Sequence, residues 1–229
     1  MTYDARLARL PHYTRFPSML PHVGSGYART RTLIIGESHY LPKGSDIHHD
    51  EGRWYGGADA VGPVPILTDV ERRYMDTRGV LAEYGQAPTT LAFRIYLNVD
   101  HALRDIGSGL SLRDDFAFLN YFQRPAQQTG RSIEPGALDR EVAYDNLLAV
   151  CGILECARVL FVSKRAYWAF LRERRRRDDS RASFEVYGFS HPATSWWNRE
   201  TDQSHNGFPE RRTNRAAFGA VVRAGVVGG

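Results

Sequence analysis

Four side chains able to do chemistry follow one short apolar run. Residues 33–35, Leu-Ile-Ile, lead into Gly36 and then into residues 37–40, Glu-Ser-His-Tyr. A carboxylate, a hydroxyl, an imidazole and a phenol can supply a general base, a nucleophile and hydrogen-bond donors. The contiguous apolar run predicts a parallel strand covered on both faces, and Gly36 permits a sharp turn. We therefore expect these side chains at the carboxyl end of a buried strand, where open α/β sheets bind ligands, although an ordinary polar turn would look the same.

Two further predicted strands end in polar groups of the same kind. The apolar run at residues 116–119 ends at Asn120, and a short strand over residues 183–189 ends just before His191. Each residue also has a purely structural explanation, because asparagine and histidine are common in turns after strands. Three predicted strands of this chain therefore end in polar groups that could meet at one edge of the sheet.

The elements that must position these groups alternate between strands and helices. Apolar spacing predicts helices over residues 67–84, 91–103, 138–156, 165–175 and 214–224, and another strand over 158–162. This alternation predicts an α/β fold, a three-layer α/β/α sandwich with a mainly parallel central sheet. No linker divides the chain, so we expect one domain over residues 1–229, with residues 1–30 as an ordered lead-in packed on the first strand.

Composition narrows the class of protein. The net charge is +4, and 28 of the 30 basic residues are arginines. Arginine forks suit phosphates, but arginine usage also follows genomic base composition. The arginine-rich run at residues 172–179 is either a solvated helix end or a phosphate-binding patch. No apolar run is long enough for a bilayer, the N-terminus has no secretory pattern, and two cysteines give no disulfide framework, so we expect a soluble cytoplasmic protein without a membrane partner.

A metal site is not expected. Residues 48–50, His-His-Asp, carry ligand types, but adjacent histidines point apart and no other cluster has ligand spacing. We expect no metal and no other cofactor.

The three strand ends together resemble the motifs of the uracil-DNA glycosylase superfamily. That superfamily has a Gly-Gln-Asp-Pro-Tyr or Gly-Glu-Ala-Pro-Gly turn after its first strand, an asparagine ending a middle strand, and a final His-Pro-Ser. Here the matching residues are 36–40, Asn120 and residues 191–192, His-Pro. The resemblance covers the chain from about Gly24 onward and is closest to a poorly characterised bacterial branch with Gly-Glu-Ser-His-Tyr as its first motif. It implies a uracil-DNA glycosylase-like fold.

The resemblance also implies an activity: flipping a base of single- or double-stranded DNA into a crevice and hydrolysing its N-glycosidic bond. The base would be uracil or a modified pyrimidine. His191 would stabilise negative charge on the pyrimidine O2, Asn120 would read the pairing edge, Tyr40 would crowd the 5-position, and Glu37 would position water. The enzyme would act as a monomer in base excision repair.

The first motif departs from the family at two positions. Ser38 stands where the uracil-specific branch has its catalytic aspartate, and His39 stands where the family has proline. Either Glu37 takes over the work of the aspartate, with Ser38 orienting water, or the substrate differs, or activity is weak or absent.

Further DNA contacts are expected around these motifs. In the family, the residues after the last motif contact phosphates and insert a wedge into the base stack. Tryptophans are also common in cores and lids. The expected DNA-binding residues are Thr194, Ser195, Trp196 and Arg124, and the expected stacking residues are Trp54 and Tyr55.

Two other functions remain open. A serine hydrolase of the GDSL type also begins with strand-Gly-acid-Ser and ends with Asp-x-x-His, so Ser38, Asp202 and His205 could form a relay. Against it, the acid before Ser38 is glutamate and no Gly-x-Asn-Asp block exists. The other alternative is a catalytically silent nucleic-acid binder of the same fold.

Overall fold

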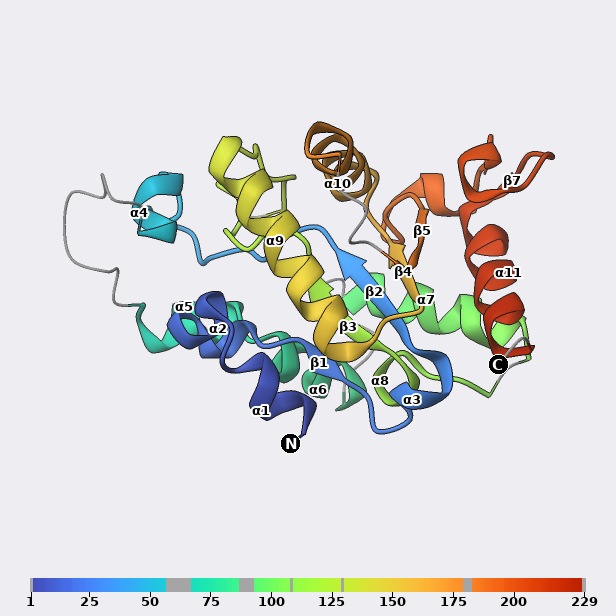
Figure 1. Ribbon diagram of the computed structural model, residues 1–229, viewed down its shortest axis with the longest axis horizontal. Coiled ribbons are helices and arrows are strands. Elements are labelled where there is room, and N and C mark those ends of the chain that lie inside the picture. The colour runs from blue at the N-terminus through green and yellow to red at the C-terminus, as the bar shows by residue number, and fades with distance from the viewer. Residues whose placement is uncertain are drawn as a thin grey trace.

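A five-stranded sheet forms the centre of the molecule (Figure 1). The computed structural model describes residues 2–56, 67–86, 93–107, 109–128, 130–178 and 183–227. The strand order is β1-β3-β2-β4-β5; β1 is antiparallel to β3, and the other neighbouring pairs are parallel. The strands are β1 (His22–Val23), β2 (Thr32–Gly36), β3 (Ala117–Asn120), β4 (Arg158–Phe161) and β5 (Glu185–Gly188).

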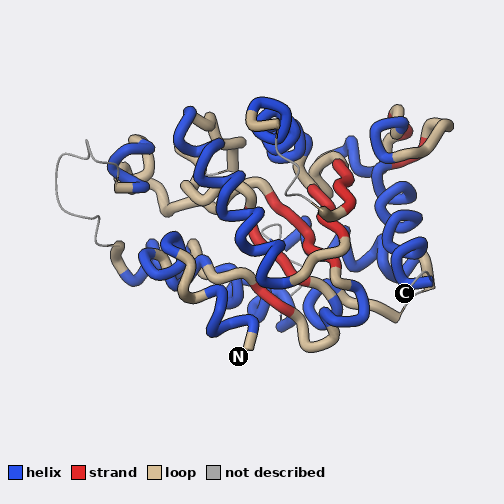
Figure 2. The backbone as a smooth tube through the Cα atoms, in the orientation of Figure 1, coloured by secondary structure: helices blue, strands red, loops and turns tan. Residues whose placement is uncertain are grey.

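Helices surround the strands, which run through the middle of the molecule (Figure 2). The longer helices are α6 (Thr77–Gln86), α7 (Arg94–Asp105), α9 (Ala137–Leu154), α10 (Lys164–Arg176) and α11 (Asn214–Val227). The shorter α-helices are α1 (Tyr3–Leu7), α2 (Pro11–Arg15), α3 (Tyr27–Thr30), α4 (Glu51–Tyr55), α5 (Asp69–Tyr74) and α8 (Leu112–Asp115). Three 3₁₀ turns, η1 (Pro17–Met19), η3 (Ser195–Asn198) and η4 (Ser204–Asn206), and a small hairpin of β6 (Glu200–Thr201) and β7 (Arg212–Thr213) complete the described elements.

Both faces of the sheet are covered. Successive strand residues point to opposite faces, and the residues on each face belong to a different buried cluster. Leu33 and Ile35 of β2 belong to one buried cluster that includes Tyr144 of α9. Ile34, between them, belongs to a second cluster that includes Phe218 of α11. In Figure 1, α9 accordingly crosses in front of the sheet while α7 lies behind it. The expected mixed α/β fold with a mainly parallel sheet is therefore confirmed, and it is compatible with an α/β/α sandwich.

The helix expected over residues 67–84 is two helices, α5 and α6. Asp76 lies in the break between them and caps the start of α6. Its Oδ1 accepts hydrogen bonds from the backbone N–H groups of Arg78 (3.1 Å) and Gly79 (2.8 Å). Aspartate at such a position caps the free amides of a helix start. The apolar pattern is continuous across the break and does not show it.

The described part of the lead-in, residues 2–30, packs apolar side chains into the cluster that contains Leu33 and Ile35 of β2, but its own strand does not pair with β2. Its β1 strand pairs with β3, with His22 opposite Phe118. Arg31 then turns the chain from α3 into β2 through a left-handed conformation, φ 45°. The predicted helix over 91–103 begins at Arg94 in the described part of the chain.

The order of connections defines where a site can form. From β2 the chain reaches β3 by way of α7 on one face, and it then returns by way of α9 on the other face to β4 on the opposite side of β2. In open α/β sheets, ligands bind outside the carboxyl ends of the strands where the order reverses in this way. That point lies between the ends of β2 and β4. Among the described helices, none is both long and apolar enough to cross a membrane.

Candidate active site

Glu37 joins the ends of β2 and β4. It follows β2 directly, and its Oε2 accepts a hydrogen bond of 2.7 Å from Oγ of Ser163, which follows β4. The same Oγ accepts from the N–H of Ala166 (3.3 Å), so Ser163 also caps α10. Ser163 is 1% exposed. The contact with Ala166 fixes its hydroxyl, and the hydroxyl holds the Glu37 carboxyl at the point where the strand order reverses. Ser163 was not singled out from the sequence, so its contact with Glu37 was not predicted.

Asn120 lies against Gly36. The two residues are opposite one another in the parallel pairing of β2 and β3. A Cβ added to Gly36 would collide with Oδ1 of Asn120 and would lie 3.1 Å from Cζ of Phe118. Gly36 is the last residue of β2 and is not among the residues with positive φ, so it does not make the expected sharp turn. Glycine is needed here because the Asn120 side chain occupies the space of a Cβ.

His191 presents a hydrogen-bond donor near Glu37. Its Nδ1 accepts from the N–H of Ala193 at 3.2 Å, which places the proton of the neutral ring on Nε2. Burial lowers the pKa of His191 below its ordinary value, and the Glu37 carboxylate raises it in partial compensation. At neutral pH the site therefore combines a neutral Nε2–H donor and a neighbouring carboxyl group.

Two asparagines, Asn214 and Asn98, hold the loop that carries His191 through three hydrogen bonds. Oδ1 of Asn214, which is fully buried at the start of α11, accepts from the N–H of Ser190 at 2.8 Å, and its Nδ2 donates to the carbonyl of Trp196 at 3.0 Å. Nδ2 of Asn98 in α7 donates to the carbonyl of Pro192 at 2.8 Å. Helices α7 and α11 thus fix both ends of the loop, a role that sequence reasoning missed because the partners are far apart in the chain.

The remaining residues of the first motif differ in their exposure and in their contacts. Tyr40 is 36% exposed, and burial and the Glu37 carboxylate both raise its pKa, which places it beside Glu37. Ser38 is half-buried, and its hydroxyl has no hydrogen-bond partner among the described residues. His39 is buried; its Nε2 lies 3.2 Å from Oγ1 of Thr77, and burial lowers its pKa to about 4. His39 therefore fastens α6 to the loop after β2 and does not face the site.

Trp54, Tyr55 and Arg124 do not lie where the sequence analysis expected them to act. Trp54 is fully buried and its ring stacks on Phe16 at 4.5 Å. The hydroxyl of Tyr55 donates to Oδ1 of Asp139 at 2.9 Å. Arg124 is 2% exposed, and its Nε donates to the same Oδ1 at 2.9 Å. The burial of Trp54 and Arg124 removes them from reach of a base or a phosphate, contrary to expectation, and half-buried Tyr55 has its hydroxyl bound to Asp139 and not directed at a base.

Thr194, Ser195 and Trp196, in the turn after His191, are exposed. Thr194 closes the turn through its N–H and Oγ1, which both donate to the carbonyl of His191 (3.0 and 2.8 Å). Ser195 is exposed, and Trp196 is 54% exposed with the guanidinium of Arg199 5.1 Å from its ring centre. Trp197, in contrast, is 1% exposed in the core. Of the two tryptophans, only Trp196 is free to touch a partner.

The relay of a serine hydrolase is not assembled by the described contacts. Nε2 of His205 lies 2.9 Å from the carbonyl oxygen of Gly188, to which it donates, and its ring is next to Lys164. Asp202 accepts from the N–H of Ser204 at 2.8 Å. Within the described residues neither Asp202 nor His205 is hydrogen-bonded to Ser38.

The described residues hold no cluster of ligands that suggests a metal. The rings of His48 and His49 lie 4.6 Å apart, but no three His, Cys, Asp or Glu side chains of the described residues could hold an ion together.

Comparison with known proteins gives no family assignment. No family model matches the chain, and no curated protein is significantly similar to it in sequence.

Proposed function

We propose that this chain is a DNA glycosylase of the uracil-DNA glycosylase-like fold, which hydrolyses the N-glycosidic bond of a flipped uracil or modified pyrimidine. The observation that carries the proposal is the Glu37 carboxyl held by Ser163 where the strand order reverses, with His191 close enough for the Glu37 charge to raise its pKa. His191 is a neutral donor through Nε2, and Glu37 is a carboxyl group held by Ser163. Asn120 presents an amide at the same edge of the sheet.

These groups match the charges that develop in the reaction. When the bond between the sugar C1′ and the base nitrogen breaks, the electron pair stays on the base and negative charge reaches its carbonyl oxygen. Nε2–H of His191 donates to that oxygen. A water oxygen bonds to C1′, and Glu37 takes the proton that the water loses. Asn120 has both a donor and an acceptor for the pairing edge of the base.

Ser163 supports this role of Glu37 without touching substrate. Its hydroxyl is committed to Glu37 and to the N-terminus of α10, which limits the carboxyl to one orientation. Because Ser38 cannot supply a negative charge, Glu37 is the acid in the first motif that can face the cationic sugar.

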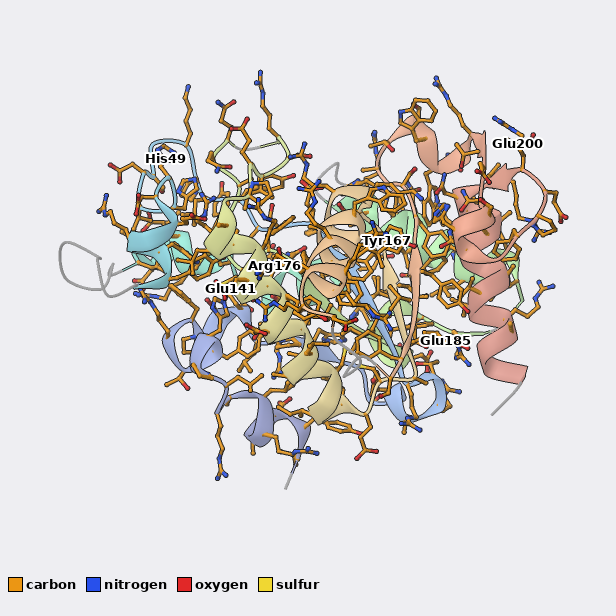
Figure 3. All side chains as sticks on the ribbon, turned by 45° about the horizontal axis from the view of Figure 1, so that its top comes forward. His49, Glu141, Tyr167, Arg176, Glu185 and Glu200 are labelled. Carbon is orange, nitrogen blue, oxygen red and sulfur yellow. The ribbon has the colours of Figure 1, made fainter. Side chains whose placement is uncertain are left out.

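An abasic-site cleavage assay tests the proposal. The substrates are single- and double-stranded oligonucleotides that carry uracil, hydroxymethyluracil, hypoxanthine, or deaminated or glucosylated bases. We expect release of at least one pyrimidine, and a loss of about 10²–10⁴-fold in rate for Glu37→Gln and His191→Gln. The control is His49→Gln, because His49 is exposed and lies far from Tyr167 and the rest of α10 (Figure 3).

The same assay separates the alternatives. Absence of release from every substrate by the unaltered protein contradicts the proposal. Salt-dependent DNA binding without release identifies a silent binder. Labelling of Ser38 by a fluorophosphonate probe identifies a serine hydrolase instead.

A further inference from the structure

A groove lies between the start of α9 and one face of α10, from Arg165 to Arg172. It has a volume of about 370 Å³, within the range of small-ligand sites. Arg165, Trp168 and Arg172 contribute from α10, where their spacing of three and four residues puts them on one face of the helix. The other lining residues are Pro135, Arg140 and Ala169.

The three arginines of this groove are not neutralised by carboxylates. Arg140 donates to the carbonyl of Pro135 (2.7 Å), and Arg165 donates to that of Ile133 (2.8 Å). Neither has an ion pair within the described part of the chain, and Arg172 has no polar partner there. Carbonyl contacts orient a guanidinium but leave its positive charge in place, so the groove carries three uncompensated charges.

The arginines at the end of α10 provide an internal comparison for the charges of the groove. There Arg176 binds Glu173 at 2.8 Å, and Arg177 binds Asp145 at 2.6 Å. The hydrogen bond with Glu173 raises the pKa of Arg176, and Glu141 of α9, which lies beside Arg176 in Figure 3, raises it further. Acidic residues thus neutralise Arg176 and Arg177, whereas no acid is among the described residues that line the groove.

Trp168 adds an aromatic face to the charged groove. It is 53% exposed, although a tryptophan buries a large apolar surface when it can. One side of the ring is supported by Tyr167 (ring centres 4.9 Å apart) and His205 (6.1 Å). The ring is therefore held in place while about half of its surface remains open for stacking.

Arg165 and Arg172 are seven residues apart, which corresponds to about 10 Å along the helix axis. That separation suits a chain with repeating phosphates better than a single phosphate ion. An open aromatic ring between arginines is the combination that binds single-stranded nucleic acid, through base stacking and backbone contacts. Arg165 is two residues from Ser163, so the groove begins at the same end of α10 as the candidate active site.

We propose that this groove binds a single-stranded stretch of nucleic acid, with Arg140, Arg165 and Arg172 on phosphates and Trp168 stacked on a base. This inference rests on the proposed function for the identity of the substrate, since it places the strand beside the base that is cleaved. It extends that function by assigning the protein a preference for single-stranded DNA flanking the target base.

Binding of a fluorescein-labelled oligothymidylate, which carries no base to be released, tests the groove alone. Fluorescence anisotropy is measured between about 50 and 200 mM salt for the unaltered full chain and its variants. Trp168→Ala should weaken binding by roughly 5- to 150-fold, while Trp168→Phe should retain most of it. Arg165→Ala/Arg172→Ala should reduce the slope of log K against log salt by about 1.4, because each single-strand phosphate contact contributes about 0.7.

The matched control is Arg9→Ala, which removes an exposed arginine from the turn after α1. All altered groove positions are exposed, and thermal unfolding checks that each variant is folded. The proposal is overturned if the unaltered protein does not bind oligothymidylate, if Trp168→Ala binds normally, or if Arg9→Ala lowers the salt slope as much as an altered groove arginine. It is also overturned if inorganic phosphate at low millimolar concentration displaces the oligonucleotide, since the groove would then be an ion site. Groove-dependent binding without base release would support the groove and contradict the glycosylase proposal, so the two can fail separately.

Discussion

Glu37 is the residue through which three strand ends interact. It follows β2, accepts a hydrogen bond from Ser163 after β4, and raises the pKa of His191 after β5. Its neighbour Gly36 contributes by lacking a side chain, because Asn120 occupies that space. The chemistry of the site thus depends as much on the absence of a Cβ at Gly36 as on the polar groups themselves.

Gly36→Ala tests this close approach. The new Cβ would meet Asn120 and Phe118 on a buried strand, so we expect a loss of about 1–3 kcal/mol in the free energy of unfolding. Displacement of the Asn120 amide should also lower base release. Urea denaturation and the abasic-site assay measure the two effects.

Gly152→Ala is the matched control, because nothing lies within 4 Å of the position of its Cβ in α9. Alanine in an open helical position should stabilise the protein by up to about 1 kcal/mol. Equal stability of Gly36→Ala and Gly152→Ala would show that Asn120 does not depend on the glycine.

At the scale of elements, a buried ion pair fastens the long connection after β3 to α9. Nε of Arg124 donates to Oδ1 of Asp139 at 2.9 Å, and both side chains are at most 3% exposed. Arg124 also donates to the carbonyls of His48 (2.6 Å) and Glu134 (3.2 Å). One side chain therefore connects the loop before α4, the loop before α9 and α9 itself.

We expect Arg124→Met to cost about 3–5 kcal/mol of unfolding free energy, because it leaves the Asp139 carboxylate buried without its partner. Arg215→Met removes a comparable bidentate pair with Asp105 at the surface, where the side chains are 34% and 53% exposed. That control should lose less than about 1 kcal/mol. Similar losses for the two variants in chemical denaturation would contradict the structural role of Arg124.

Elements were predictable from sequence where their pattern is local. Contiguous apolar runs identify β2 and β3, and helical spacing identifies α9, α10 and α11. The role of Arg124 was not predictable, because an arginine after a strand end looks the same whether it faces solvent or a carboxylate such as Asp139. The burial of Trp54 depends likewise on Phe16, a partner 38 positions away in the chain.

For the whole molecule, the order of the strands determines which polar residues meet. Glu37, Asn120 and His191 were singled out from the sequence because each follows a predicted strand. That Glu37 meets Ser163 depends on β2 lying between β3 and β4, and this order leaves no mark in the pattern of any one segment. The sequence therefore singles out polar residues that follow strands, but it does not predict the contacts between them.

Stability of the whole molecule should fall in mild acid, because buried histidines are neutral in the folded state. Burial lowers the pKa of His39 to about 4 from 6.5, and that of His12 to about 3. The unfolded chain binds protons at these histidines below about pH 6.5, whereas the folded chain does not until the pKa of the buried form is reached. The contribution to stability is thus complete above pH 6.5 and is lost as the pH falls toward 4, by up to about 3 kcal/mol for His39.

The measurement is urea denaturation of the unaltered protein and of His39→Gln from pH 7.5 to 4.5. Glutamine can keep a hydrogen bond to Thr77 but does not titrate, so the slope of stability against pH should decrease by up to about 1.4 kcal/mol per pH unit in this window. Carboxyl groups that titrate at the lower end affect both proteins equally and cancel in the difference. His49→Gln alters an exposed ring and should leave the slope unchanged. If the stability of His39→Gln depends on pH in the same way as that of the unaltered protein, then His39 takes up a proton in the folded state as readily as in the unfolded state. The loop after β2 would then be open to water, which would also expose the nearby Glu37 carboxyl.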